Sequence, residues 1–244
     1  MPQKIAILAL ALLLPLEAAF AFKGLSAPEA SDPSGAAAAH SGMHHGGPSG
    51  SKDGVPMVDK MIARLNERLA HEPDNLPARI MLASIYKEAG RADEAARTSA
   101  EVDQRLAALV ERVRQNPGSD DLADPLLLAD AYNMLGRYGD AVSVYAAIEN
   151  KIDSDPDLLI DYAETLAQAD PQSLVGKPLE LAERALKINP RHLSALLFAA
   201  TAAEKAGDKA KVAAYWETAL PLVEPGSALE KDLRDKLDAL KRAD

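Results

Sequence analysis

The chain of 244 residues contains no cysteine, and this absence excludes several kinds of chemistry at once. Without a thiol the protein has no disulfide, no thiolate metal site, no thiol redox motif and no Cys-x-x-Cys-His haem attachment of its own. Aromatic residues are also few, at 4% of the chain, whereas Ala, Leu, Asp and Glu are abundant. Such a composition favours helices that pack through small side chains over a β-sandwich.

Basic residues are fewer than acidic ones. The chain has 27 Lys and Arg and 37 Asp and Glu, for a formal net charge of −10. A strongly acidic chain is repelled by the phosphate backbone of nucleic acids, so nucleic acid is not expected among its partners. A basic or neutral protein partner is easier to accommodate.

The sequence also lacks a recognisable catalytic, cofactor-binding or metal-binding constellation. His71 and His192 are isolated next to Pro turns, and neither has the partner that a general base needs. His40, His44 and His45 could belong to a metal-binding tract, but no further ligand stands at a fixed spacing, so a polar segment is the simpler interpretation. We therefore expect no enzyme activity, no cofactor and no metal site.

What the sequence does contain is an internal repeat. One stretch has the spacing A-x2-Y-x3-G-x-Y-x2-A-x3-Y, formed by Ala129, Tyr132, Gly136, Tyr138, Ala141 and Tyr145. This pattern is typical of the tetratricopeptide repeat, a helix–turn–helix unit of about 34 residues. The small residue Ala129 recurs in register as Ala83, Ala163 and Ala200. The sequence therefore predicts an all-α tetratricopeptide-repeat α-solenoid with about four helix pairs, a lead-in helix and a C-terminal capping helix.

The expected helices follow from the apolar period and from breaks at Pro and Gly. They cover residues 55–69, 76–89, 92–115, 122–135, 138–152, 157–168, 178–188, 193–206, 209–222 and a last helix, capped by Ser227, that ends near 241. The helix expected at 92–115 is unusually long and keeps an apolar stripe. It either projects beyond the stack as a docking edge or folds back onto the core, and we expect the second.

Three segments of different composition divide the chain. Residues 1–22 combine Lys4, an apolar stretch and an Ala19-Phe20-Ala21 site, as in a signal peptide or an uncleaved N-terminal membrane anchor. Both alternatives place the remainder across the inner membrane. Residues 23–54 are rich in Gly, Ser, Ala and Pro, with His, and are expected to form a disordered linker. Residues 55–244 form the expected repeat domain.

The last third of the chain carries a more specific resemblance than the repeat alone. It rests on D-Y-A-E-T-L-A at 161–167, S-L-x-G-x-P at 173–178, E-R-A-L-x-x-x-P-x-H at 183–192, A-Y-W-E-x-x-L at 214–220 and P-G-S at 225–227. These stretches resemble the repeat domain of the tetratricopeptide component of bacterial c-type cytochrome biogenesis, the CcmI/CycH family. The likeness covers roughly residues 55–240 and is weakest in the first repeat, at residues 76–115. Large members carry a membrane domain with two spans, whereas this chain has at most one.

The resemblance implies a function for the repeat domain. In the family this module holds apocytochrome c, chiefly its C-terminal helix, and presents it to the haem-ligation complex. It therefore implies a periplasmic scaffold or chaperone, anchored to the inner membrane by its N-terminus, with apocytochrome c and haem-ligation subunits as partners. One alternative is a generic periplasmic repeat adaptor for another envelope assembly. A haem-lyase subunit with catalysis in this chain is disfavoured, because cysteine is absent and no paired histidines stand near a membrane face.

The candidate binding surface is the concave groove that first helices of this repeat generally line. Apolar contacts for an amphipathic helix are expected from Ile80, Leu126, Ile160 and Leu197. The polar candidates are Ser84, Lys87, Asp130, Asn133, Glu164, Gln168, Thr201, Glu204 and Lys205. We expect Glu164 and Glu204 to be exposed and to meet basic residues of the bound helix.

Overall fold

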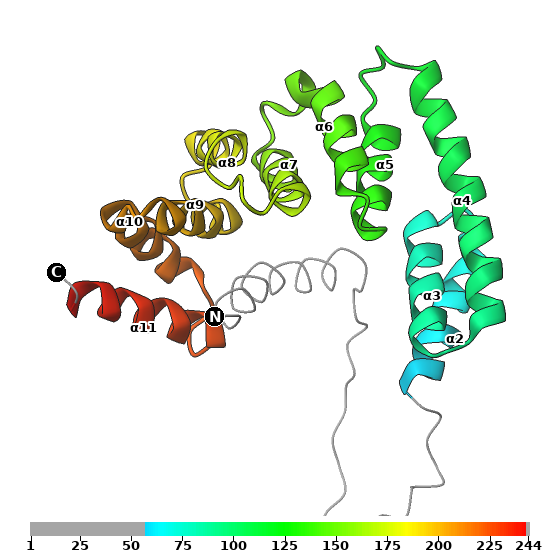
Figure 1. Cartoon of the computed structure of the whole chain (residues 1–244), viewed down its shortest axis with the longest axis horizontal. Coiled ribbons are helices and arrows are strands. Elements are labelled where there is room, and N and C mark those ends of the chain that lie inside the picture. Colours follow the sequence, from blue (N-terminus) through cyan, green and yellow to red (C-terminus); the bar gives the residue numbers. More distant parts are fainter. Residues whose placement is uncertain (1–56, 243–244) are drawn as a thin grey trace, which may run out of the picture. The chain divides into compact units, whose positions relative to one another are not determined.

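The computed structural model describes residues 57–242, which belong to a compact unit running from Gly54 to Asp244 (Figure 1). Its helices are α2 (Met57–His71), α3 (Leu76–Glu88), α4 (Ala92–Gln115), α5 (Ala123–Met134), α6 (Tyr138–Ile152), α7 (Pro156–Ala169), α8 (Lys177–Ile188), α9 (Leu193–Ala206), α10 (Lys209–Ala219), a 3₁₀ turn (Leu220–Leu222) and α11 (Ala228–Arg242). No strand occurs within 57–242. The all-α prediction is confirmed, and the expected targeting segment and linker lie outside the described residues.

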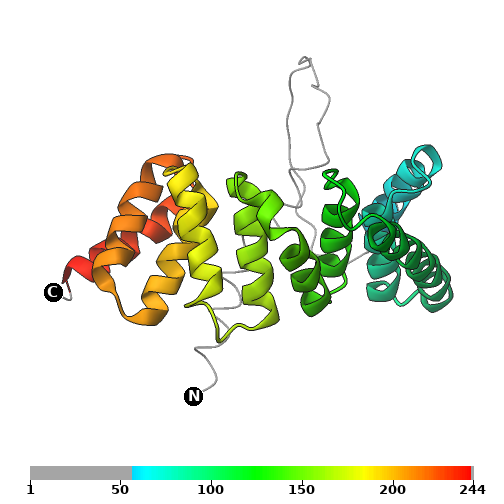
Figure 2. The ribbon, with the colours of Figure 1, turned by 90° about the horizontal axis from the view of Figure 1, so that it is seen from above.

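Each helix of this unit packs mainly on the next one along the chain, as the two views show (Figures 1 and 2). The pairs α3/α4, α5/α6, α7/α8 and α9/α10 are the four expected repeats, and α2 packs on α3 as the lead-in helix. First helices of neighbouring repeats also touch, α3 with α5 and α7 with α9. The described unit is therefore a tetratricopeptide-type α-solenoid. None of its helices is both long enough and apolar enough to cross a bilayer.

Small side chains bring the helices of repeats two to four close together. Ala129, Ala163 and Ala200 are each 0% exposed. A residue without bulk beyond Cβ lets a neighbouring helix approach closely, and the surrounding side chains then fill the space to native density. Beside this contact the rings of Tyr145 and Tyr162 stack with their centroids 5.2 Å apart. The core of the central repeats thus combines alanines at the close contacts with the stacked tyrosines and with larger side chains such as Leu159 and Leu181.

The turns inside the repeats use glycine except in repeat three. Gly90, Gly136 and Gly207 have φ of 70°, 68° and 76°, the left-handed region that costs glycine least at the end of a helix. In repeat three α7 ends at Ala169, and residues 170–176 form a longer connection to α8. The longer connection was expected from the sequence, and it replaces the glycine turn.

The long helix α4 lies on the core along most of its length. Val102, Leu106 and Leu109 are 2–4% exposed and belong to the same apolar cluster as Leu128 and Tyr132 of α5. The expectation that this helix folds back onto the core is confirmed, and the alternative of a projecting docking edge is wrong. The physical reason is that its apolar stripe stays in phase with the start of repeat two.

The last helix, α11, covers the end of the solenoid. Leu233 and Leu237 pack in one cluster with Trp216 of α10, which is 6% exposed. Ser227 accepts a hydrogen bond from the Glu230 backbone N–H at 3.1 Å, the N-cap that the sequence predicted. Trp216 is therefore a packing residue. The helix expected at 209–222 ends earlier, at Ala219, and continues as the 3₁₀ turn.

Candidate functional site

The predicted groove residues lie on the first helices α3, α5, α7 and α9, and side-chain caps begin three of these helices at defined residues. Asn75 Oδ1 accepts from the Ala78 N–H at 2.9 Å before α3. Asp155 Oδ1 accepts from the Asp157 N–H at 2.9 Å before α7. His192 Nδ1 accepts from the Ala195 N–H at 3.2 Å before α9. Ser84, Asp130, Glu164 and Thr201 occupy equivalent positions of successive repeats, because each directly follows the alanine that recurs in register.

The apolar part of the predicted groove is smaller than expected. Ile80 is 2% exposed and Ile160 is 3% exposed, so the expectation that they offer apolar contacts to a ligand is wrong. Ile80 packs in the cluster that holds the α4 stripe, and Ile160 packs in the central cluster with Tyr145. Leu126 and Leu197 are only partly buried against their clusters. They are the two predicted apolar residues that keep some open surface.

Three predicted polar residues make hydrogen bonds within the fold. Asn133 Nδ2 donates to Thr165 Oγ1 at 2.9 Å and so links α5 to α7. The Thr201 hydroxyl donates to the Leu197 carbonyl of its own helix at 2.9 Å. Lys205 Nζ donates to the carbonyls of Pro171 and Gln172 at 2.7 and 2.8 Å, and so holds the connection between α7 and α8. These bonds stabilise contacts between or within repeats.

Ser84, Lys87, Asp130 and Glu204 are exposed, and Gln168 is partly exposed. They keep the accessibility that a binding surface requires. Whether they contact a peptide stays a prediction, since exposure alone does not identify a ligand.

Glu164 is the predicted residue with the most unusual environment. It is only partly exposed, so the expectation of a freely exposed carboxylate is wrong. Burial, and then the neighbouring carboxylate of Asp161, raise its pKa to about 7, and no cation within residues 57–242 offsets them. The sequence could not show this, because the burial depends on how the neighbouring helices pack around α7.

Two further carboxylates gather in the same region between α5 and α7. Burial raises the pKa of Tyr145 strongly, and the charges of Asp161, Asp130 and Glu164 raise it further. All three carboxylates therefore act on the hydroxyl of Tyr145, a residue that is 1% exposed. Asp161 was missed from the sequence. Its position immediately before Tyr162 in α7 gave no signal of a shared acidic surface.

His192 has a structural role in the described part of the chain. His192 Nε2 lies 2.9 Å from Asp157 Oδ1, while Nδ1 caps α9, so both ring nitrogens are engaged. Within residues 57–242 no group of three or more His, Asp or Glu side chains could hold a metal ion. The three histidines of the expected linker lie outside these residues.

Comparisons with known proteins give a likeness at the level of helical repeats. No protein-family model matches the sequence, and no curated protein sequence matches it. A crystal structure of MamA is 18% identical, with a TM-score of 0.42 over 67% of this chain and 87% of that chain. MamA residues 41 to the end from Desulfovibrio magneticus RS-1 are 11% identical, with a TM-score of 0.42 over 68% and 86%.

Yeast Tom70 is 16% identical, with a TM-score of 0.49 over 76% of this chain and 37% of that chain. At such identities and scores these likenesses carry no argument about function. The fold class rests instead on the helix pairs, the buried alanines and the turn glycines described above. Solenoids of this kind present an extended surface to protein partners, and the described unit has the helix-pair architecture of the tetratricopeptide type.

Proposed function

We propose that this chain is a periplasmic scaffold of c-type cytochrome maturation that binds apocytochrome c through its C-terminal helix. It presents the apocytochrome to the haem-ligation complex and does not ligate haem itself. Residues 1–22 hold the domain at the inner membrane. The support is the sequence resemblance of the stretches between 161 and 227, together with the chemistry of the groove.

The observation that carries the proposal is the acidic surface between α5 and α7. Asp130, Asp161 and Glu164 act on one buried tyrosine, and the described part of the chain brings no cation to Glu164. A carboxylate that is partly removed from water attracts a cation more strongly than one in bulk water. A basic, amphipathic helix laid across α5, α7 and α9 would bring that cation. Its apolar face would rest on the open surface of Leu126 and Leu197.

Binding of such a helix should depend on pH in a defined direction. The pKa of Glu164 is about 7, so the group is largely protonated at pH 6 and largely ionised at pH 8. A bound Lys or Arg favours the ionised form and lowers this pKa. Association therefore releases a proton, and affinity should rise as the pH increases from 6 to 8.

Titration calorimetry on residues 54–244 with the C-terminal helix peptide of an apocytochrome c from the same organism tests the proposal. We expect binding that weakens with salt and with acidification. Glu164→Gln should reduce affinity at pH 8 by about tenfold and remove the pH dependence. Glu67→Gln, which alters an exposed carboxylate on α2, is the matched control and should leave both unchanged.

Failure to bind any apocytochrome peptide, with the helical fold intact by circular dichroism, would contradict the proposal. The generic periplasmic adaptor would then be the better interpretation. The small apolar part of the groove favours this second candidate, because Ile80 and Ile160 are buried and leave less surface for the apolar face of a helix. Binding of basic helices of any origin with equal affinity would also support the adaptor.

A further inference from the structure

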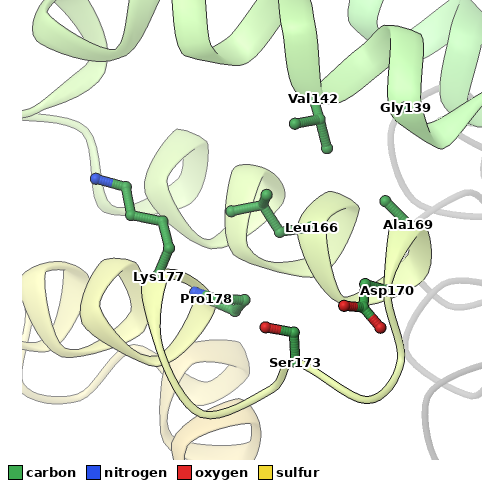
Figure 3. A pocket seen from close by; sticks show the side chains of 8 residues that line it. All are labelled: Gly139, Val142, Leu166, Ala169, Asp170, Ser173, Lys177 and Pro178. Carbon is green, nitrogen blue, oxygen red and sulfur yellow. The ribbon is translucent and has the colours of Figure 1, made fainter.

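The connection between α7 and α8 borders a small open pocket with α6, and none of the predicted groove residues lines it (Figure 3). Its volume is about 260 Å³. Val142 of α6, Leu166 and Ala169 of α7 and Pro178 of α8 supply an apolar lining, and Asp170 and Ser173 lie at its rim. The pocket exists because repeat three has this longer connection in place of a glycine turn.

The walls of the pocket are fixed by contacts outside it. Leu174 is 1% exposed and anchors the middle of the connection in the central core. Lys205 of α9 holds the carbonyls of Pro171 and Gln172 at 2.7 and 2.8 Å. Lys177 turns its amino group to Glu149 of α6, so its aliphatic stem remains at the pocket. A pocket held in this way is formed before a ligand arrives, which reduces the cost of binding.

The size of the pocket limits what it takes. A dry cavity of about 150 Å³ already accepts benzene, whereas drug-sized ligands and cofactors occupy about 300–1,000 Å³. A volume of about 260 Å³ therefore suits one large apolar side chain better than a cofactor.

The charge at the rim limits the occupant further. The Lys177 cation is matched by the carboxylates of Glu149 and Glu180. Asp170 is exposed and uses Oδ1 to accept the Gln172 N–H at 3.1 Å, and no ion pair within 57–242 involves it. The rim is therefore net negative on the Asp170 side. A cation placed beside the mouth would find a complementary charge.

We propose that this pocket binds a single leucine- or methionine-sized side chain of a partner polypeptide, with a basic residue next to it that meets Asp170. The pocket residues differ from the groove residues, so the inference does not rest on the proposed function. A scaffold with both surfaces holds one protein in the groove and a second at repeat three. The longer connection then serves as a docking element, beyond its role as a turn.

Gly139 allows a direct test, because it lines the pocket and lies in the first turn of α6. A Cβ added to Gly139 meets nothing within 4 Å, and its φ lies outside the left-handed region. Gly139→Leu should therefore fold normally and fill the mouth of the pocket with its own side chain. Ala147→Leu, which adds the same side chain at an exposed position of the same helix, is the matched control.

The probes are the dipeptides N-acetyl-Leu-Arg-amide, N-acetyl-Leu-Glu-amide and N-acetyl-Ala-Arg-amide, followed by methyl NMR of the whole unit. We expect N-acetyl-Leu-Arg-amide to shift the methyl signals of Val142 and Leu166 with a Kd on the order of 1 mM. Ala147→Leu should keep this response, and Gly139→Leu should remove it. The Ala dipeptide should bind at least about tenfold more weakly, because it lacks the buried apolar atoms.

The rim is tested with the same probes at low salt. N-acetyl-Leu-Arg-amide should bind about threefold more tightly than N-acetyl-Leu-Glu-amide, and Asp170→Asn should abolish that difference. Asn at 170 still accepts the Gln172 N–H, so the turn is kept. Absence of shifts at Val142 and Leu166 would overturn the pocket. Equal shifts in Gly139→Leu, or no preference for Arg over Glu, would overturn the assigned occupant.

Discussion

Repeat one and the repeats that follow carry the same sequence marks but pack differently. Ala83, the alanine of repeat one that is in register with Ala129, Ala163 and Ala200, is partly exposed, whereas the other three are 0% exposed. The same small residue at the same repeat position thus sits in a tight contact in three repeats and in a looser one in the first. A signature residue permits close approach, but the helices around it decide whether the approach occurs.

Repeat one makes its contact with repeat two through large side chains instead. Leu106 and Leu109 of α4 pack with Leu128 and Tyr132 of α5. A contact made by branched and aromatic residues is sensitive to the loss of volume, whereas a contact made by alanines is sensitive to added volume. The two regions should therefore respond to opposite kinds of substitution.

The largest effect is expected from removing volume in repeat one. Leu109 is 2% exposed, and Leu109→Ala should lower the free energy of unfolding by about 2–5 kcal/mol, measured by urea unfolding. Leu135→Ala, at a side chain that is 38% exposed, should cost less than about 1 kcal/mol. An effect of Leu109→Ala no larger than this control would show that the α4 extension does not support the core.

Adding volume should destabilise the later repeats more than repeat one. Ala163→Leu should overpack the contact between repeats two and three and lower the free energy of unfolding by about 1–3 kcal/mol. Ala83→Leu, the equivalent change in repeat one, should cost less than about 1 kcal/mol, because the site is partly open. Thermal or urea melts of both variants check this, and equal losses would remove the distinction between the two contacts.

The features that the sequence predicted are those set by local chemistry. The start of α11, the length of α4 and the turn at Gly136 follow from the Ser227 cap, the apolar period and backbone freedom over a few residues. The four repeats could be placed for the same reason, since a 34-residue period needs no tertiary information. The all-α architecture therefore follows from the amino-acid pattern alone.

The features that the sequence did not predict depend on how the helices rotate against each other. Assigning Ile80 and Ile160 to the groove assumed that every first helix turns the same face outward, and the structure buries both. Lys205 was placed in the groove because the path of the connection at 170–176 was unknown. The pocket at Val142 and Leu166 was not predicted for the same reason, because the path of this connection forms it. A loop path is set by tertiary contacts that no periodic pattern encodes.

The carboxylate of Glu164 should give repeat three a pH-dependent stability that repeat one lacks. Its pKa is about 7 in the folded state, above its ordinary value of 4.5, so between these values the native state binds more protons than the unfolded state. The stabilisation from its protonated form is complete below pH 4.5 and is lost as the pH rises through 7. Glu164→Gln should therefore raise the free energy of unfolding at pH 8 by about 1–3 kcal/mol and leave it unchanged at pH 4.

Urea unfolding at the two pH values measures this difference. Ser84 holds the equivalent position in repeat one and is exposed, so Ser84→Glu is the matched control and should not change the pH dependence. If Ser84→Glu destabilised the fold at pH 8 as well, the groove would exclude water in both regions. An unchanged pH profile in Glu164→Gln would show that Glu164 is solvated.

The smallest effects should be alike in the two regions, because helix caps act locally. Asn75 caps α3 of repeat one and His192 caps α9 of repeat four, through bonds to the Ala78 and Ala195 N–H groups at 2.9 and 3.2 Å. Asn75→Ala and His192→Ala should each cost about 1 kcal/mol, measured by urea unfolding. His192→Asn should recover most of that loss, because Asn caps well and the contact of His192 with the exposed Asp157 contributes little. A much larger loss at His192, not recovered by Asn, would mean that its bond to Asp157 joins repeats three and four, and that the two regions differ in their caps as well as in their packing.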